Sequence, residues 1–196
     1  MRALRSLVFV AVAGLIALGC LPRIPRQRLA EPAKIAVAYI VDPSYAGAPF
    51  SPPEALRKAI AKELSDHNLE AKELPLETVS SQRLTDARFE ALKRAQAAEG
   101  VPYFLLVEQR VQFFSQIDGR YRWEVGTSLT ASRTEGAVAK DPFEIPVVLM
   151  FDHEKEREAI VYAAPDIANR VGVLLDGLLA GAPPLTPAAA VDAGTP

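Results

Sequence analysis

The chain of 196 residues has very few of the side chains that most often carry out chemistry, with one cysteine and two histidines. A single cysteine excludes a disulfide within the chain and any metal site that needs several cysteines. The 22 Lys and Arg are balanced by 24 Asp and Glu, for a formal net charge of −2. Nucleic-acid-binding domains usually carry a basic excess, so no nucleic-acid partner is expected.

Sequence motifs of catalysis are also missing. The 11 glycines form neither G-x-G-x-x-G nor G-x-x-x-x-G-K-[ST], and no serine lies in G-x-S-x-G. His153 and Glu154 begin like the zinc motif H-E-x-x-H, but Arg157 occupies the position of the second histidine. His67 follows a predicted helix, where a cation near the C-terminus is favourable. We therefore expect a protein that is not an enzyme and that binds no metal or cofactor.

A long hydrophobic run is missing as well, because the longest uncharged apolar segment is Ser6–Gly19. A helix needs about 20 residues to cross a bilayer, so this segment is too short for a membrane span. Arg2 and Arg5 precede it. A basic start followed by a short apolar core is typical of a secretory signal peptide, which we place at residues 1–19.

The apolar segment ends in Ala17-Leu18-Gly19-Cys20. This ending resembles the lipobox of bacterial lipoproteins, in which small residues precede a cysteine that becomes lipidated. The pattern prefers leucine three residues before the cysteine, where this chain has Ala17. The resemblance implies a lipid anchor, palmitate included, on Cys20; the alternatives are an ordinary signal peptide or a buried cysteine. Leu21 rather than aspartate follows, which in the enteric pattern implies the outer membrane, with the protein facing the periplasm.

The rest of the chain divides into three parts by composition. Residues 20–33 hold the lipidation site and a linker with three prolines and three arginines, which predicts an extended tether. Residues 182–196 hold four prolines and one charge, which predicts a disordered tail. We expect residues 34–181 to form a single α/β domain in the periplasm. The tether arginines, which could alternatively contact anionic headgroups, are Arg23, Arg26 and Arg28.

Hydrophobic periodicity predicts the first elements of this domain. Lys34–Val41 is nearly continuous in hydrophobicity, as in a buried central strand. Glu70–Val79 predicts a second strand, and Thr85–Glu99 predicts a helix that ends at Gly100. Between the two strands, a helix is predicted from an apolar stripe at every fourth position, formed by Leu56, Ile60 and Leu64.

Tyr103–Arg133 predicts a β-hairpin with its tip near Asp118-Gly119. A two-residue turn would place polar positions opposite apolar ones. A three-residue loop, Ile117-Asp118-Gly119 with a left-handed Gly119, keeps the two faces separate, and a one-residue slip would exchange them. We therefore favour the three-residue loop. It predicts four pairs: Phe113 with Trp123, Val111 with Val125, Gln112 with Glu124 and Phe114 with Arg122.

The last third of the domain begins with a predicted strand at Phe143–Phe151, where Pro146 indicates an edge position or a bulged partner. Arg157–Ala163 fits a strand or a short helix, and we favour the strand. Pro165 then begins a final helix that ends at Gly181. The order β-α-β-α-β-β-β(-β)-α predicts an α/β chain of the α+β two-layer class, with a mixed sheet and helices packed on one face.

This order resembles the small domains of envelope lipoproteins, namely the CsgG-type secretion lipoproteins, the amino-terminal domain of TolB, and LptE. The likeness covers Lys34–Gly181 and is one of topology and texture rather than of a diagnostic motif. It implies a non-catalytic adaptor of an envelope assembly or transport machine, such as lipopolysaccharide assembly or secretion. The segments that carry it are Ala97-Ala98-Glu99-Gly100-Val101-Pro102-Tyr103, Gly119-Arg120-Tyr121 and Thr134-Glu135-Gly136.

Two hypotheses for the function follow. In the first, the lipid anchor holds a binding module at the membrane, and the edge of the sheet or its solvated face docks an envelope protein or, alternatively, lipid or lipopolysaccharide. In the second, the chain is a periplasmic hydrolase or transferase that uses carboxylates, and two convergent carboxylates in a pocket would favour it. The candidate partner-binding residues, whose alternative interpretation is an ordinary solvated sheet face, are Arg110, Gln112, Phe114 and Arg122.

Overall fold

The computed structural model describes residues 26–43, 48–134, 136, 138–150 and 155–180. The predicted signal peptide, the Cys20 lipidation site, the His153-Glu154 pair and the C-terminal tail therefore lie outside the described residues. The elements in chain order are β1 (Ala33–Pro43), α2 (Glu54–Asp66), β2 (Leu69–Glu73), α3 (Glu77–Ser80), α4 (Thr85–Glu99), β3 (Tyr103–Ile117), β4 (Arg120–Arg133), β5 (Val138–Leu149) and α5 (Glu156–Ala180).

The strands form one mixed five-stranded sheet in the order β2-β1-β3-β4-β5. Strand β1 pairs in parallel with β2 and β3, whereas β3, β4 and β5 form an antiparallel meander. The mixed sheet and the α+β class are as predicted. Strand β5 lies at the edge of the sheet and carries Pro142 and Pro146, so the edge position that a strand proline indicates is confirmed.

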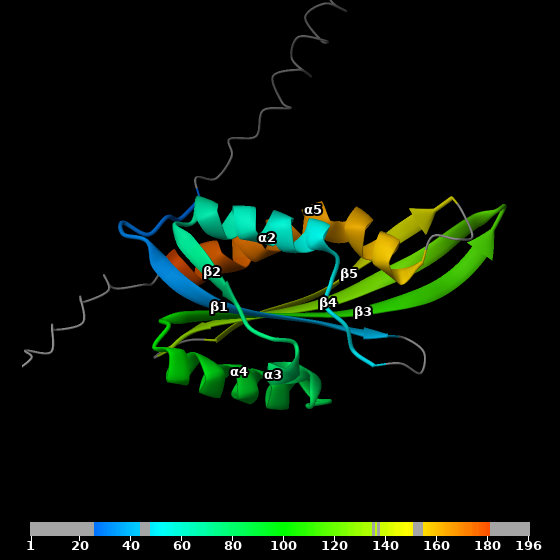
Figure 1. The fold of residues 1–196 in the computed structure, drawn as a ribbon. Coiled ribbons are helices and arrows are strands. Elements are labelled where there is room, and N and C mark those ends of the chain that lie inside the picture. Colours follow the sequence, from blue (N-terminus) through cyan, green and yellow to red (C-terminus); the bar gives the residue numbers. More distant parts are fainter. Residues whose placement is uncertain (1–25, 44–47, 135, 137, 151–154, 181–196) are drawn as a thin grey trace, which may run out of the picture.

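The helices lie on both faces of the sheet, which corrects the prediction that they pack on one face (Figure 1). Helices α2 and α5 cover one face and enclose the larger core, while α3 and α4 cover a smaller core on the other. The physical reason lies in β1. Ile35 and Val37 enter the larger core, and the alternate residues Ala36 and Ala38 enter the smaller one, so the strand needs cover on both sides.

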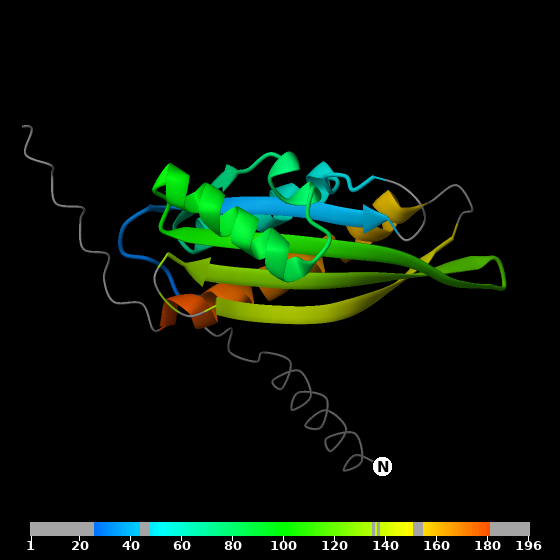
Figure 2. The same cartoon turned by 90° about the horizontal axis from the view of Figure 1, so that it is seen from below.

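The cover on the second face is incomplete. Helix α4 lies mainly against β1 and β3 on this side (Figure 2). Phe89 of α4 packs against Phe104 of β3 with ring centroids 5.1 Å apart. Thr130 and Ser132 of β4 are buried on this face as well. Among the described residues, the hairpin end of β3 and β4 and the outward side chains of β5 are the part of this face that is exposed to solvent.

The C-terminal helix corrects two predictions. Arg157–Ala163 is helical rather than a strand, and Pro165 lies inside α5 rather than at its start. Ile160 and Ile167, on either side of the proline, are both fully buried against the sheet. Since helical stability in proteins comes mainly from packing an apolar face, this long buried stripe outweighs the hydrogen bond that proline cannot donate.

The predicted second strand is shorter than expected. Strand β2 ends at Glu73, and Glu77–Ser80 forms the short helix α3 instead of continuing the strand. The Leu74 N–H still donates to the Val37 carbonyl at 2.8 Å. Pro75 follows and has no N–H to extend the ladder, which explains why the strand stops here.

The β3–β4 hairpin confirms the predicted register but not the predicted loop. Phe113 pairs with Trp123, as expected. The turn contains only Asp118 and Gly119, with φ of 51° and 72°, as in the two-residue turns favoured in hairpins. The extra residue is instead accommodated by a bulge at Phe114, so that Ser115 and not Phe114 pairs with Arg122. The left-handed Gly119 is confirmed.

Candidate functional site

The register of the hairpin brings three of the four predicted binding residues to one face of the sheet. Arg110 pairs with Gly126, Gln112 with Glu124, and Arg122 with Ser115, and the three side chains are exposed on the face that α4 leaves open. Phe114 lies in the bulge and is 69% exposed. Since a bulge can re-aim a side chain at the end of a sheet, the aromatic ring is presented to solvent rather than to the core.

The same end of the sheet exposes residues that the sequence analysis missed. Val148 pairs with Arg122 and is 51% exposed, and Ile117, beside the turn, is 46% exposed. Arg120, opposite Ile117, is exposed as well. The outward phase of β5 could have indicated Val148, because every second residue of that strand faces away from the larger core. We call the following set the docking surface: Arg110, Gln112, Phe114, Ile117, Arg120, Arg122 and Val148.

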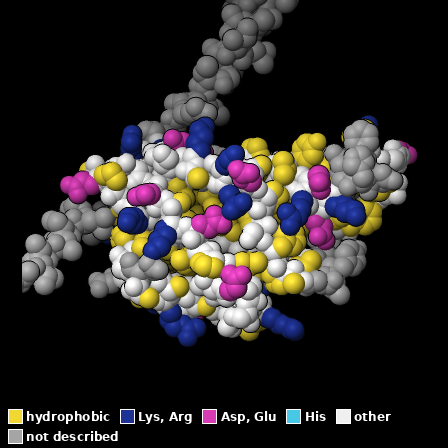
Figure 3. Space-filling view, in the orientation of Figure 1, with side chains coloured by type: hydrophobic (Ala, Val, Ile, Leu, Met, Phe, Trp, Pro, Cys, Tyr) yellow, Lys and Arg dark blue, Asp and Glu magenta, His cyan; other side chains and the backbone are white. Residues whose placement is uncertain are grey.

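The docking surface carries three arginines, which have no ion-pair partner among the described residues. Acidic side chains lie beside them: Glu124 between them in the register, Glu144 next to Gly126, and Asp118 in the turn. On the side of the molecule shown in Figure 3, basic, acidic and hydrophobic side chains are interspersed. The arginines are therefore free to bind the carboxylates of a partner.

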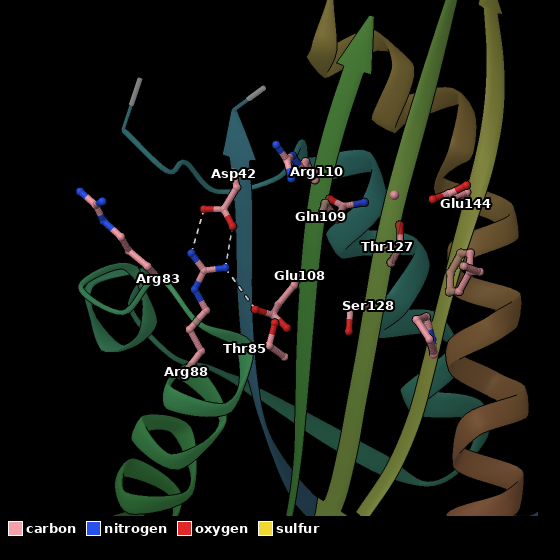
Figure 4. Close-up of a pocket in the computed structure, with 13 residues that line it drawn as sticks. Asp42, Arg83, Thr85, Arg88, Glu108, Gln109, Arg110, Thr127, Ser128 and Glu144 are labelled. Atoms are coloured by element: carbon pink, nitrogen blue, oxygen red, sulfur yellow. Dashed lines mark hydrogen bonds and ion pairs between the residues drawn. The ribbon is translucent and has the colours of Figure 1, made fainter. Parts of the chain in front are cut away.

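A cleft of ≈ 520 Å³ adjoins the docking surface at Arg110. Its floor is the open face of β3, β4 and β5, and its wall is the beginning of α4 with the end of β1 (Figure 4). Gly126 lies in the floor, where the missing side chain leaves the backbone accessible. Asp42, Thr85 and Arg88 lie along the wall, and Glu108 lies on β3 where the floor meets it.

Arg88 binds two carboxylates in this wall and is itself only 4% exposed. Its Nη1 and Nη2 donate to the two oxygens of Asp42 at 2.6 and 2.8 Å, and Nη1 also donates to Glu108 Oε1 at 3.1 Å. The Nε–H donates to the Gln82 carbonyl at 2.9 Å. We call Asp42, Arg88 and Glu108 the wall cluster. It joins α4 to β3, which follows it in the chain, and to β1, which lies four elements earlier.

The pKa values in the wall cluster follow from burial and hydrogen bonding. Burial raises the pKa of Glu108, and the hydrogen bonds from Arg88 and Thr85 only partly oppose that rise. Burial alone would lower the pKa of Arg88, but the bonds to Asp42 and Glu108 outweigh it and raise that pKa. Two carboxylates thus converge in the cleft, which favours the enzyme hypothesis. Both oxygens of Asp42 and Oε1 of Glu108 are bound to the guanidinium, however, and Glu108 Oε2 is buried.

Metal binding finds no support in the part of the chain that the structure describes, where no three potential ligands among His, Cys, Asp and Glu cluster. His67 lies at the C-cap of α2, as predicted. It is fully buried, with Nδ1 2.7 Å from the Glu63 carbonyl oxygen and Nε2 3.1 Å from Asp176 Oδ1. None of the described helices is long and apolar enough to cross a membrane.

Comparison with known proteins gives structural neighbours only. No protein-family model matches the chain, and no curated protein matches it. A minor lipoprotein from Acinetobacter baumannii is 9% identical, with a TM-score of 0.39 over 74% of this chain and 91% of its own. A lipoprotein from Neisseria meningitidis is 13% identical, with a TM-score of 0.44 over 72% and 99%. Rare lipoprotein B from Shewanella oneidensis is 8% identical, with a TM-score of 0.34 over 71% and 94%.

At identities and TM-scores this low, no conclusion about the activity or partners of this chain follows from its neighbours. The likeness to CsgG-type, TolB and LptE domains stays a prediction. So do the lipidation of Cys20, which lies outside the described residues, and the partner-binding role of the exposed sheet face.

Proposed function

We propose that the chain is an outer-membrane lipoprotein, anchored through Cys20 and facing the periplasm, that serves as a non-catalytic docking module. Its partner is an envelope protein whose surface is acidic and partly apolar. The observation that carries this proposal is the convergence of arginines without ion-pair partners and of exposed apolar side chains at the hairpin end of the sheet, which the described helices leave uncovered. Lipid and lipopolysaccharide are the competing partners, and the experiment below distinguishes them.

The chemistry of the docking surface suits a protein partner. Arginine and aromatic residues are enriched among the side chains that contribute most to protein–protein binding. Phe114 is largely exposed and lies outside both cores, so folding alone gives no reason for a phenylalanine in this bulge. Arg110 and Arg122 lie on the same face and can bind carboxylates of a partner in a planar, two-point geometry.

The geometry of the wall cluster also supports a non-catalytic role. The convergent carboxylates Asp42 and Glu108 are held by Arg88, and both oxygens of Asp42 accept from it. A general base needs to reach a substrate proton within hydrogen-bond distance. Asp42 has both oxygens bound to a guanidinium, and the second oxygen of Glu108 is buried, so both carboxylates are poorly placed for that role.

The test is recovery of partners from bacterial envelopes with the lipidated, full-length protein. The triple variant Arg110→Ser, Phe114→Ser and Arg122→Ser should lose a crosslinked protein partner by at least about tenfold, because truncation of binding hot spots typically costs 2 kcal/mol or more. A matched control changes three exposed residues on and beside α4, Leu84, Lys93 and Arg94, to serine, and should keep the partner.

The outcomes are distinct. Loss of the protein partner in the first variant alone supports the proposal. Equal recovery with both variants contradicts it and makes the docking surface an ordinary solvated face. If the first variant instead loses bound lipid or lipopolysaccharide while its protein partners are unchanged, the partner class proposed here is wrong.

A further inference from the structure

The last residues of the predicted tether are docked on the folded body by a guanidinium. Arg26 Nη1 donates to Asp176 Oδ2 at 3.1 Å, and Nη2 donates to Asn169 Oδ1 at 3.0 Å. Nη2 also forms an ion pair with Glu63 Oε2 at 3.2 Å. Glu63 belongs to α2, and the other two residues belong to α5, so Arg26 joins the end of α2 to the C-terminal half of α5. Its side chain is 30% exposed.

The backbone of the same segment is also bound. The Gln27 N–H donates to Asp176 Oδ1 at 2.7 Å, and the Leu29 N–H donates to the His67 carbonyl at 3.2 Å. Asn68 returns a hydrogen bond from its side-chain amide to the Leu29 carbonyl at 3.1 Å. The Leu29 side chain packs against the larger core. A segment held through backbone, charge and apolar contacts is part of the fold rather than a free linker.

Helix α5 leaves room for this docking at Gly172. A Cβ built at that position would lie 2.5 Å from Glu63 Oε2 and 2.7 Å from Arg26 Cζ. Any larger residue would have to displace one of the two charged groups. Glycine lowers the stability of a helix relative to alanine. At position 172, however, the absent side chain leaves the space that Arg26 and Glu63 occupy.

The electrostatics of the docked segment depend on Arg26. Burial alone would raise the pKa of Asp176, but hydrogen bonds from the Gln27 N–H, Arg26 and His67 outweigh it and hold that pKa below its usual range. The side chains of Glu63 and Asp176 are only 18% and 22% exposed. Without Arg26, two mostly buried carboxylates would lose their shared cation.

We propose that residues 26–29 form a clasp that shortens the working tether from residues 21–33 to residues 21–25. This inference rests on the proposed anchor at Cys20. Six residue steps from Cys20 to Arg26 extend at most about 20 Å, whereas thirteen steps to Ala33 extend about 45 Å. The clasp therefore holds the end of the body that carries Arg26 close to the membrane, and its opening more than doubles the length of the tether.

Figure 1 shows where the clasp lies relative to the docking surface. The first described residues and the end of α5 lie at one end of the body, and the β3–β4 hairpin lies at the opposite end. Strand β3 has 15 residues at about 3.3 Å each, so the two ends are separated by a distance on the order of 50 Å. The docking surface is therefore at the end of the body remote from the clasp.

The first experiment measures closure of the clasp by trypsin cleavage of the chain from Cys20 onward, with each cut identified by mass spectrometry. Trypsin must insert an arginine side chain into its own pocket, so a docked Arg26 resists cleavage. We expect the Arg26–Gln27 bond to be cut at least about tenfold more slowly than the Arg23–Ile24 bond, because proteolysis follows the population of the open form. The double variant Glu63→Gln and Asp176→Asn should abolish most of this difference.

The control is Glu90→Gln with Asp166→Asn, the same two changes at exposed positions of α4 and α5, and it should cleave like wild type. Circular dichroism checks that the variants fold. If the Glu63 and Asp176 variant does not fold, Asn169→Ala, at an exposed position, replaces it and should speed the Arg26–Gln27 cut several-fold. Equal rates at Arg23 and Arg26 in the wild type would overturn the clasp.

The second experiment measures the reach directly. The chain is coupled through Cys20, its only thiol, to a maleimide lipid in a supported phosphatidylcholine bilayer, and neutron reflectivity gives the protein profile. Wild type should begin within about 20 Å of the headgroups, and the clasp variant should spread toward about 45 Å. Identical profiles would refute the shortened tether. Because the lipid is attached chemically and no partner is present, either result leaves the proposed docking function to its own test.

Discussion

The clasp and the wall cluster are built alike, since each places one arginine between two carboxylates from different elements, yet they differ in depth. The side chain of Arg88 is 5% exposed and contacts Asp42 at 2.6 Å, whereas that of Arg26 is 30% exposed with contacts of 3.0 to 3.2 Å. Arg88 joins core elements, and Arg26 joins the start of the described chain to the surface of the body. The same ion-pair chemistry thus serves permanent assembly in one place and detachable docking in the other.

The largest effect is expected when the arginine of the wall cluster is replaced. Arg88→Met leaves Asp42 and Glu108 without their shared cation in a buried site, so the free energy of unfolding should fall by about 3–5 kcal/mol. Urea denaturation of the body measures it. Arg94→Met, at an exposed position of the same helix, should change stability by less than about 0.5 kcal/mol. A loss for Arg88→Met as small as that of this control would show that the wall cluster contributes no more than a surface ion pair.

A pair of glycine substitutions in α5 tests whether the clasp constrains the helix beneath it. Gly177→Ala has no heavy atom within 4 Å of the new Cβ and should stabilise the helix by up to about 1 kcal/mol. Gly172→Ala makes the same gain in helix propensity, but its Cβ would lie 2.5 Å from Glu63 Oε2 and 2.7 Å from Arg26 Cζ and must displace one of these side chains. We therefore expect Gly172→Ala to be less stable than Gly177→Ala in thermal unfolding. Equal stabilisation by the two substitutions would mean that Arg26 is not held where the structure places it.

Removal of the clasp arginine should have a smaller effect than removal of Arg88. Arg26 remains partly solvated, so Arg26→Ala should cost about 1 kcal/mol or less. Arg28 is exposed and forms no ion pair among the described residues, so Arg28→Ala should leave the urea midpoint unchanged. If both variants lose the same amount, the effect comes from tether charge in general and not from docking.

The smallest effects concern pH, and the two clusters should respond with opposite sign. The lowered pKa of Asp176 means that its contribution is present above about pH 3.9, the value for unfolded aspartate, and is lost as the pH falls through the folded pKa. The raised pKa of Glu108 means that its contribution is present below about pH 4.3 and is lost as the pH rises through the folded pKa.

Melting temperatures between about pH 2 and pH 8 test this contrast. Asp176→Asn should flatten the decline in the melting temperature below about pH 4, and Glu108→Gln should flatten the decline as the pH rises from about 4.3 toward neutrality. Wild type at the same ionic strength is the reference. Two variants that alter the same limb of the curve would contradict the assignment of opposite signs.

The hairpin shows how far a sequence pattern reaches. Alternation from Tyr103 to Arg133 predicted the inner pairs correctly, because only one register keeps Phe113 opposite Trp123. It could not locate the extra residue, since a three-residue loop and a bulge at Phe114 shift the register by the same amount. Alternation therefore disfavours the two-residue turn, although this is the turn that the structure contains.

Contacts between distant residues are the part that the sequence could not reveal. Asp42, Arg88 and Glu108 belong to three elements, and nothing in their spacing distinguishes them from other charged residues. The same holds for the tether. Its three arginines have similar sequence neighbours, so the sequence does not indicate that Arg26 is the one that binds the folded body. A glycine inside a helix, such as Gly172, indicates that another group packs closely there. The sequence does not say that this group is the Arg26 side chain.

The two prolines of β5 have a consequence for a protein that is anchored as proposed. Lipidated copies share a two-dimensional surface, where neighbours meet side by side at high lateral concentration and open sheet edges can zip together. Pro142 and Pro146 are four residues apart and so present their missing N–H groups on the same side of this edge strand. An approaching strand would find two of its acceptors unsatisfied. Crowding on the membrane is therefore tolerated without fibre-like association along this edge.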